Sequence, residues 1–170
     1  AIMVTEQPPT DELFLSVFAN NALTTLAQRN RGWPRLARLS PNGRWIAYTE
    51  SLEGREEIFI QGYPEAGIRR QITVDGGRNP VWRRDGRELY FRRAGGVFAV
   101  TIDTTAGLKW SQAARLFDGR FAFSVFSDYD VAPDGRFLMI KPAPTENAAS
   151  PLNVVANWQA ELAARVPIAR

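Results

Sequence analysis

Short runs in which apolar and polar residues alternate recur along the chain and predict β-strands throughout. In Trp45–Thr49, Ile46 and Tyr48 point to one side of an extended backbone and the remaining residues to the other. The same pattern predicts strands at Glu12–Phe18, Leu23–Ala27, Glu57–Tyr63, Arg69–Val74, Val97–Asp103, Ala113–Asp118 and Leu152–Trp158. Such a distribution is typical of an all-β protein.

One short turn sequence occurs three times between strands. Its core is Asn or Asp, then Gly, Arg, any residue, and Ile or Leu, and it lies within Ser40–Tyr48, Arg83–Phe91 and Ala132–Ile140. Because Asn-Gly and Asp-Gly tolerate positive φ, each copy predicts a tight hairpin. We expect the Asn or Asp to cap its turn and the Arg to pair across strands. The strands before these turns are predicted to end at Leu39, Trp82 and Val131.

The spacing of the turns indicates a repeated unit. Gly43 and Gly86 are 43 residues apart, and Gly86 and Gly135 are 49 residues apart. Repeats of this length are typical of the four-stranded blades of a β-propeller. The sequence therefore predicts an all-β, propeller-type fold with about three four-stranded antiparallel blades, followed by a short C-terminal helix.

The repeat also predicts the domain organisation. Residues 1–11 are expected to form a flexible N-terminal arm, and the blades to span residues 12–158. Residues 159–170 are expected to form a helix and tail, because Ala160, Leu162, Ala163 and Val166 have helical spacing. Within the blade region we expect an outer hairpin at 12–28, complete blades at 33–74 and 78–118, and a partial blade at 123–158.

The ends of this array are incomplete. About three blades are fewer than the four to eight that close a propeller ring, and an open stack leaves apolar faces uncovered at both ends. One expectation is a homodimer with six blades in all, in which the N-terminal hairpin of each chain supplements the last sheet of the other. The alternative is a single chain whose ends are covered by its own helix and N-terminus.

The hairpin repeats resemble those of the TolB-type, WD-related β-propellers of bacteria, whose core is Ser-Pro-Asp-Gly-Arg, any residue, Ile-Ala-Phe/Tyr. Ser40–Tyr48 matches almost throughout, with Asn42 in the usual Asp place, whereas Arg83 and Arg84 replace Ser-Pro in the second copy. The resemblance covers roughly residues 12–158, and its last part looks like the C-terminal blades of such propellers in larger bacterial proteins. The resemblance implies the fold and does not by itself imply a function, because one fold serves many functions.

Composition excludes several kinds of chemistry. The chain has no Cys and no His, which excludes disulfides, thiolate nucleophiles, Cys/His zinc sites and His-based triads. The net charge of +3 is too small to indicate a nucleic-acid partner. We expect no membrane insertion, because no run approaches the roughly 20 apolar residues that span a bilayer, and we see no signal peptide. A periplasmic and a cytoplasmic location both fit these features.

Candidate ligand-binding residues follow from the expected architecture. In a propeller, the loops that enter the innermost strands gather at one end of the central channel. Here these loops are Asn30–Arg35, Asp75–Asn79 and Gly119–Asp128. They supply side chains suited to a peptide or an anionic ligand: Arg31, Trp33, Asp75, Arg78, Asn79, Phe126 and Asp128. The alternative interpretation is that these residues only hold neighbouring blades together.

Other motifs favour structural roles. The glycine-rich segment Val74–Pro80 lacks the Gly-Lys-Ser/Thr ending of a phosphate-binding loop. Asp118, Asp128 and Asp130 lack the spacing of an EF-type calcium loop. We therefore predict no catalytic residue, no metal site and no cofactor.

The sequence favours a non-catalytic binding or assembly module whose partner is a protein, a peptide or a second copy of the chain. Two alternatives remain. A carboxylate-based hydrolase, such as a glycosidase, would need two acidic residues about 5–10 Å apart across a cleft. A structural fragment of a larger multidomain propeller protein would place its ligand-binding blades elsewhere.

Overall fold

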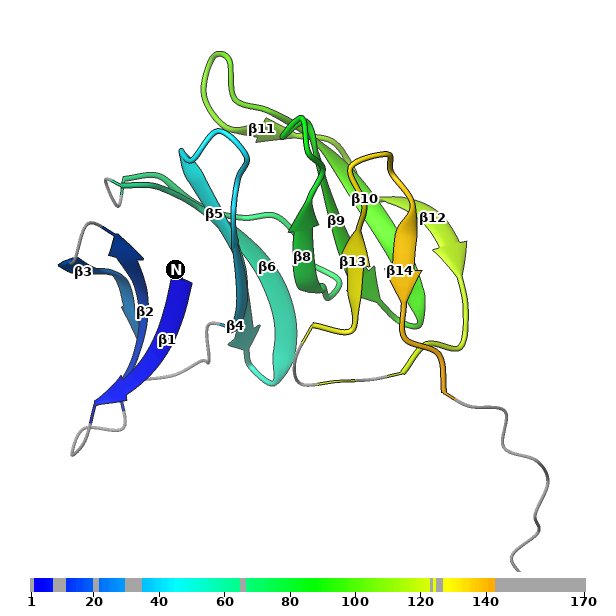
Figure 1. Cartoon of the computed structure of the whole chain (residues 1–170), viewed down its shortest axis with the longest axis horizontal. Helices are drawn as coiled ribbons and strands as arrows, with labels where there is room; N and C mark the ends of the chain where they lie inside the picture. Colours follow the sequence, from blue (N-terminus) through cyan, green and yellow to red (C-terminus); the bar gives the residue numbers. More distant parts are fainter. Residues whose placement is uncertain are drawn as a thin grey trace, which may run out of the picture.

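The computed structural model describes residues 2–7, 12–19, 22–29, 35–64, 67–122, 124 and 127–142. Its regular elements within these residues are all β-strands, arranged in four antiparallel sheets that follow one another in chain order (Figure 1). Sheet 1 consists of β1 (Ile2–Gln7), β2 (Glu12–Ala19) and β3 (Ala22–Arg29). Sheet 2 consists of β4 (Arg35–Leu39), β5 (Trp45–Leu52), β6 (Arg55–Gly62) and β7 (Arg69–Gln71).

The second half of the described chain forms a large sheet and a small one. Sheet 3 consists of β8 (Arg78–Trp82), β9 (Glu88–Arg93) and β10 (Gly96–Asp103), with β11 (Lys109–Trp110) and β12 (Ala114–Asp118) both pairing with β10. Sheet 4 consists of β13 (Tyr129–Val131) and β14 (Phe137–Met139). The first strands of the two central sheets, β4 and β8, lie side by side, and we call β4, β8 and β13 the inner strands.

The predicted strands agree closely with the structure. The inner strands end at Leu39, Trp82 and Val131, as the sequence predicts. One difference lies at the start of the chain, where Ile2–Gln7 pairs with β2 instead of forming a flexible arm. This segment contains the β-branched residues Ile2, Val4 and Thr5, which favour extended backbone. The predicted strand at Leu152–Trp158 and the predicted C-terminal helix at 159–170 lie outside the described residues.

The three repeated turns have the backbone geometry that the sequence predicts. Gly43, Gly86 and Gly135 adopt φ values of 69°, 71° and 87°. The Asn or Asp before each glycine accepts a hydrogen bond from the backbone N–H two residues later, at 3.0–3.1 Å. The Arg136 side chain, expected to pair across strands, instead binds Asp134 of its own turn, with Nε 2.7 Å from Oδ2.

The third hairpin differs from the other two in register. Leu39 lies opposite Ile46 and Trp82 opposite Leu89, whereas Val131 lies opposite Phe137, one residue earlier than the repeat predicts. The backbone N–H of Ala132 correspondingly bonds four residues ahead, and the N–H groups of Ser40 and Arg83 bond five residues ahead. A shift of one residue moves every side chain of a strand to the opposite face.

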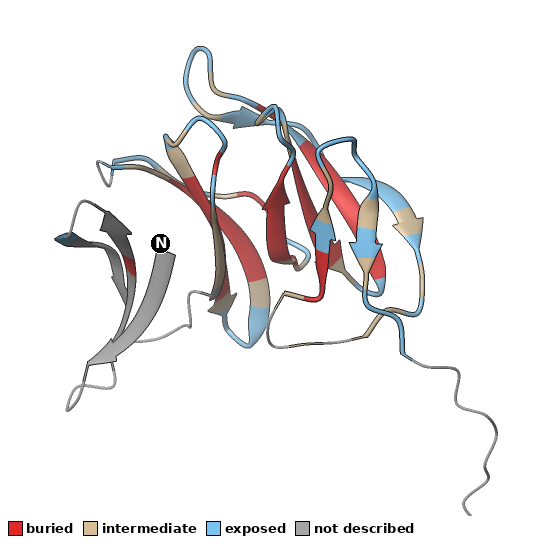
Figure 2. Cartoon of the chain, viewed as in Figure 1, coloured by how far each residue is buried: buried red, intermediate tan, exposed pale blue. Residues whose placement is uncertain are grey.

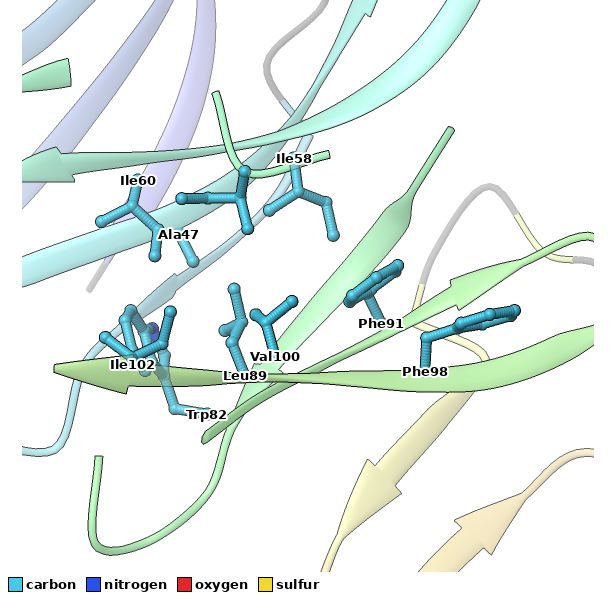
Figure 3. Close-up of a cluster of buried hydrophobic side chains, with 10 residues drawn as sticks. Ala47, Ile58, Ile60, Trp82, Leu89, Phe91, Phe98, Val100 and Ile102 are labelled. Atoms are coloured by element: carbon cyan, nitrogen blue, oxygen red, sulfur yellow. The ribbon is translucent and has the colours of Figure 1, made fainter. Parts of the chain in front are cut away.

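Packing between neighbouring sheets forms the core. Sheet 2 presents Ala47, Ile58 and Ile60 to sheet 3, which presents side chains that include Leu89, Phe91 and Val100 (Figure 3). Buried residues are concentrated in these two central sheets (Figure 2). The opposite face of sheet 3 packs against sheet 4 through a second cluster: Val81, Tyr90, Ala99, Tyr129, Val131, Phe137 and Met139. Sheet 3 is therefore covered on both faces.

Replacing Leu89, which is fully buried between sheets 2 and 3, tests this packing. We expect Leu89→Ala to lower the free energy of unfolding by about 2–5 kcal/mol, because it removes buried methyl groups and leaves a cavity. Leu116→Ala is the matched control on the exposed side of β12 and is expected to change it by less than about 0.5 kcal/mol. Urea unfolding measures both values, and equal losses in the two variants would contradict the packing described.

Candidate functional site

Charged and polar side chains from sheets 3 and 4 converge at one end of the inner strands. Arg78 is the first residue of β8, and Asp128 immediately precedes β13. Arg92, near the end of β9, lies opposite Arg78 in the antiparallel register. The topology thus brings Arg78 and Asp128, which are 50 residues apart in sequence, together with Arg92.

The Asp128 carboxylate is fully buried and has three side-chain partners. Its Oδ2 atom pairs with Arg78 and lies 3.0 Å from Nη1 of Arg92. Its Oδ1 atom accepts a hydrogen bond of 2.7 Å from Nδ2 of Asn79. Because a buried carboxylate needs opposite charge and hydrogen-bond donors, these contacts tie the loop before β13 to sheet 3.

Asn79 links three sheets at this point. Its backbone N–H donates to Oγ1 of Thr49 in sheet 2 at 3.0 Å, and its carbonyl accepts from the Tyr129 hydroxyl in sheet 4 at 2.9 Å. Its φ of 54° is left-handed, which Asn tolerates better than most residues. Leu36, at the corresponding position of sheet 2, has a φ of 55°, so the same irregularity begins both inner strands.

The contact between sheets repeats at corresponding positions. Thr49 and Arg92 each stand six residues after a hairpin glycine, whereas Asn79 and Asp128 each stand seven residues before one. Thr49 of sheet 2 contacts Asn79 of sheet 3, and Arg92 of sheet 3 contacts Asp128 before sheet 4. The repeated backbone therefore places a polar link at the same point between sheets 2 and 3 and between sheets 3 and 4.

Arg92 is the most enclosed cation of this cluster. Its side chain is only 8% exposed, and its guanidinium lies 5.2 Å from the centre of the Phe121 ring. Its Nε atom has no hydrogen-bond partner among the described residues. Two guanidinium groups thus share one carboxylate in a largely closed environment, which favours a role in holding the sheets together.

The candidate ligand-binding residues separate into three groups. Arg78, Asn79 and Asp128 come together as the sequence predicts, although they bind one another. Asp75 lies elsewhere: its side chain is 80% exposed, and its Oδ2 atom is 4.0 Å from Nη1 of Arg93. Arg31, Trp33 and Phe126 lie outside the residues whose side chains the structure describes.

Two participants were missed at the sequence level. Arg92 lies within a strand, and only its position in the repeat, equivalent to Thr49, would have indicated contact with the next sheet. Tyr129 is buried in the core between sheets 3 and 4, and its hydroxyl reaches the Asn79 carbonyl. A loop-based search does not find either residue, because both belong to regular strands.

A small pocket lies beside the inner strands. It has a volume of about 320 Å³ and is lined by Arg38, Ser127, Tyr129, Asp130, Leu138 and Ile140. We call it the inner-strand pocket. Its lining combines an arginine, an aspartate and two exposed aliphatic side chains, Leu138 and Ile140, on the face of sheet 4 that points away from sheet 3.

Two buried glutamates of sheet 2 have structural partners. Glu50 and Glu57 lie opposite each other in the β5–β6 register. Glu50 accepts a hydrogen bond of 2.8 Å from Nη2 of Arg69, and Glu57 accepts one of 2.5 Å from Oγ1 of Thr73. Across the residues that the structure describes, no group of three or more Asp or Glu side chains could hold a metal ion. The same residues include no helix with the length and apolar character needed to cross a membrane.

Successive antiparallel sheets of two to five strands, each built around short hairpins and packed face to face, define a β-propeller-type fold, and solved structures support this assignment. TolB from Acinetobacter baumannii is similar with a TM-score of 0.56 and 16% identity, over 85% of this chain and 35% of that one. A protein assigned as TolB from Agrobacterium tumefaciens has a TM-score of 0.55 and 19% identity, over 82% and 52% of the two chains. The chain therefore has the β-propeller fold of TolB structures.

A third similar structure has a different assigned activity. It is a protein from Bacteroides uniformis ATCC 8492 assigned as a 6-phosphogluconolactonase, with a TM-score of 0.50 and 18% identity, over 81% of this chain and 46% of that one. The chain spans between 35% and 52% of the length of these three proteins. No family model and no curated protein sequence matches it. At these identities the similarity establishes the fold alone.

Removing the charge of Asp128 tests the polar link between sheets 3 and 4. We expect Asp128→Asn to lower the free energy of unfolding by about 3–5 kcal/mol, because it leaves two largely buried guanidinium groups without their carboxylate. Asp130→Asn is the matched control, since Asp130 is exposed and its Oδ1 atom accepts only from the adjacent backbone N–H of Val131. Chemical unfolding gives both values, and an Asp128→Asn protein as stable as the control would contradict this role.

Tyr129 makes this junction less stable as the pH becomes alkaline. Burial raises the pKa of its hydroxyl well above the ordinary value of about 10, and the neighbouring Asp128 carboxylate adds to the effect. The neutral hydroxyl is thus favoured in the folded state, so its contribution is complete below pH 10 and is lost as the pH rises further. We expect the difference in unfolding free energy between the native protein and Tyr129→Phe to shrink from pH 8 to pH 11. Urea midpoints across this range measure it, and a constant difference would count against the assignment.

Proposed function

We propose that this chain is a non-catalytic propeller module that binds a protein or peptide partner through the uncovered face of sheet 4. The observation that carries the proposal is the exposure of two large aliphatic side chains there. Leu138 is 73% exposed and Ile140 is 51% exposed. Exposed aliphatic residues beside a pocket are typical of surfaces that bind another molecule.

Comparison with the other two hairpins shows that the exposure of Leu138 is unusual for its position in the repeat. The positions equivalent to Leu138 in the first two hairpins are Ile46 and Leu89, and both are fully buried. The shifted register of the third hairpin turns Phe137 and Met139 toward sheet 3 and leaves Leu138 and Ile140 on the open side. Sheet 4 thus has one covered face and one face that a further sheet or a peptide would cover.

Charge around these residues supports recognition of a protein surface. Arg38 and Asp130 line the inner-strand pocket beside Leu138 and Ile140. An apolar centre with charged groups at its edge is the usual composition of a protein interface. Arg38 also offers its backbone carbonyl to Nε1 of Trp82 at 3.0 Å, which fixes this part of β4 against β8.

The occupant that we propose is a second copy of the chain. Sheet 1 is at the opposite end of the sheet array, and its strand β2 (Glu12–Ala19) has the strongly apolar sequence Leu-Phe-Leu-Ser-Val-Phe-Ala after Glu12. Pairing sheet 1 of each copy with sheet 4 of the other would close a ring by twofold symmetry. Further blades in the same polypeptide would cover sheet 4 in the same way and are an outcome of the experiment below.

The non-catalytic part of the proposal rests on residue chemistry. The sequence contains no His and no Cys, which supply the commonest general bases and many nucleophiles. The buried acids Glu50, Glu57 and Asp128 each form an ion pair with an arginine and are held in structural contacts. A protein of similar fold is assigned as a lactonase, and one fold can serve several functions, so the fold does not by itself support this part.

The mass of the protein in solution tests self-association. Light scattering of the native chain is expected to give twice the monomer mass of 19.0 kDa at micromolar concentration. Leu138→Asp combined with Ile140→Asp should shift this to the monomer mass, because two carboxylates would be buried without partners. Ile68→Asp, at an exposed aliphatic position before β7, is the control and should remain dimeric. A native chain that stays monomeric at all concentrations would refute the second copy as occupant.

A further inference from the structure

A second and larger groove lies between the outer parts of sheets 2 and 3, away from the inner strands. Its volume is about 500 Å³, within the range of small-ligand pockets. One wall is Gln71–Asp75, from the last residue of β7 onward, and the other is Trp110–Ala113, from the last residue of β11 toward β12. Arg93, the last residue of β9, also lines the groove. We call it the rim groove.

Internal hydrogen bonds hold the first wall of the rim groove in place. The buried Glu57 carboxylate accepts from Oγ1 of Thr73 at 2.5 Å and from the backbone N–H of Gly76 at 3.0 Å. The Gln71 side chain donates to the Thr73 carbonyl at 2.7 Å. A wall fixed in this way loses little conformational freedom when a ligand binds.

The second wall is fixed to β10. The Ser111 hydroxyl accepts a hydrogen bond of 3.0 Å from the Thr101 backbone N–H, and the Ser111 N–H donates to the Thr101 carbonyl at 3.1 Å. Trp110 precedes this anchored residue and keeps 37% of its surface exposed. A partly exposed indole beside a groove is a typical anchor for a planar or apolar group.

Arg93 supplies a cation with free donors. Its guanidinium lies 4.1 Å from the centre of the Phe98 ring, and its side chain is 24% exposed. Among the described residues it makes no side-chain hydrogen bond, and its nearest carboxylate oxygen, on Asp75, is 4.0 Å away. Stacking on Phe98 orients the planar guanidinium, whose N–H groups match the two oxygens of a carboxylate.

We propose that the rim groove binds a carboxylate attached to an aromatic or other apolar group, with Arg93 pairing with the carboxylate and Trp110 contacting the apolar group. The C-terminus of a peptide that ends in an apolar residue has this chemistry, and so does a small aromatic carboxylate. Asp75 lies at the edge of the groove and disfavours a second negative charge there. Removing that charge should therefore strengthen binding, which a purely structural role of these residues would not produce. The rim groove involves no residue of sheet 4, so this proposal is independent of the surface proposed above.

Three probes test the proposal on the full chain. They are the peptide N-acetyl-Gly-Gly-Phe with a free C-terminal carboxylate, the same peptide as its C-terminal amide, and N-acetyl-phenylalanine. Binding is measured by calorimetry and by the indole N–H resonance of Trp110, assigned with Trp110→Phe. The free peptide is expected to bind at least tenfold more tightly than its amide and to shift the Trp110 resonance. Tighter binding of the peptide than of N-acetyl-phenylalanine indicates a peptide C-terminus, and equal binding indicates a small carboxylate.

Four variants separate a binding role from a structural one. Arg93→Gln should weaken binding of the free peptide at least tenfold, Arg93→Lys should weaken it less, and Asp75→Asn should strengthen it. Arg70→Gln is the matched control, because Arg70 is exposed on β7 and donates only to the neighbouring Arg69 carbonyl. Thermal unfolding verifies that each variant is folded. The proposal is overturned if neither carboxylate probe binds, if the amide binds as tightly as the acid, or if Arg93→Gln binds like Arg70→Gln.

Discussion

The face-to-face packing of neighbouring sheets is the constraint on which the rest of this structure depends. A sheet of three to five strands has two faces, and each central sheet here carries apolar side chains on both. Phe91 stacks on Phe98 within sheet 3, with ring centres 5.8 Å apart, and Leu89 and Phe91 belong to the cluster shared with sheet 2. Sheet 3 is fully covered because it has a neighbour on each side. Sheet 4 has a described neighbour on one side, and its open face defines the surface proposed for binding.

Polar links at the inner strands complement this packing. Apolar contact alone tolerates small shifts between sheets, whereas the bonds of Asn79 to Thr49 and to Asp128 require one position. These links occur at corresponding points of successive repeats, and at Asn79 the backbone irregularity that starts β8 coincides with the bonds to both neighbouring sheets. The Arg78–Asp128–Arg92 cluster is therefore better understood as a junction between sheets than as an open ligand site.

The sequence predicts most of the strand order, for a local reason. Asn-Gly and Asp-Gly demand a particular turn, and the alternation on each side of the turn predicts the strands that it joins. The register of the third hairpin cannot be predicted in this way. Asp134-Gly135-Arg136 has the same turn chemistry as Asp85-Gly86-Arg87, and yet the strands that it joins pair in a different register. The pairing after the glycine depends on packing, which favours Phe137 and Met139 against Tyr90 and its neighbours.

The candidate site is predicted only in part, for a related reason. Loop position indicates Arg78, Asn79 and Asp128 correctly as neighbours, because all three begin or precede inner strands. It does not distinguish ligand-binding residues from residues that bind one another, since that depends on burial. Arg92 and Arg93 illustrate the difference: adjacent in sequence on β9, one points into the junction with Asp128 and the other lines the rim groove, because side chains alternate along a strand.

We infer that a sheet in this protein is stable when a neighbour covers it, and that sheet 4 is open on one side among the residues that the structure describes. Amide hydrogen exchange of β14 (Phe137–Met139), compared with β9 (Glu88–Arg93), as a function of protein concentration tests this claim most directly. We expect β9 to be strongly protected at every concentration and the protection of β14 to rise as a second copy covers it. Strong protection of β14 in the dilute monomer, unchanged on concentration, would contradict it.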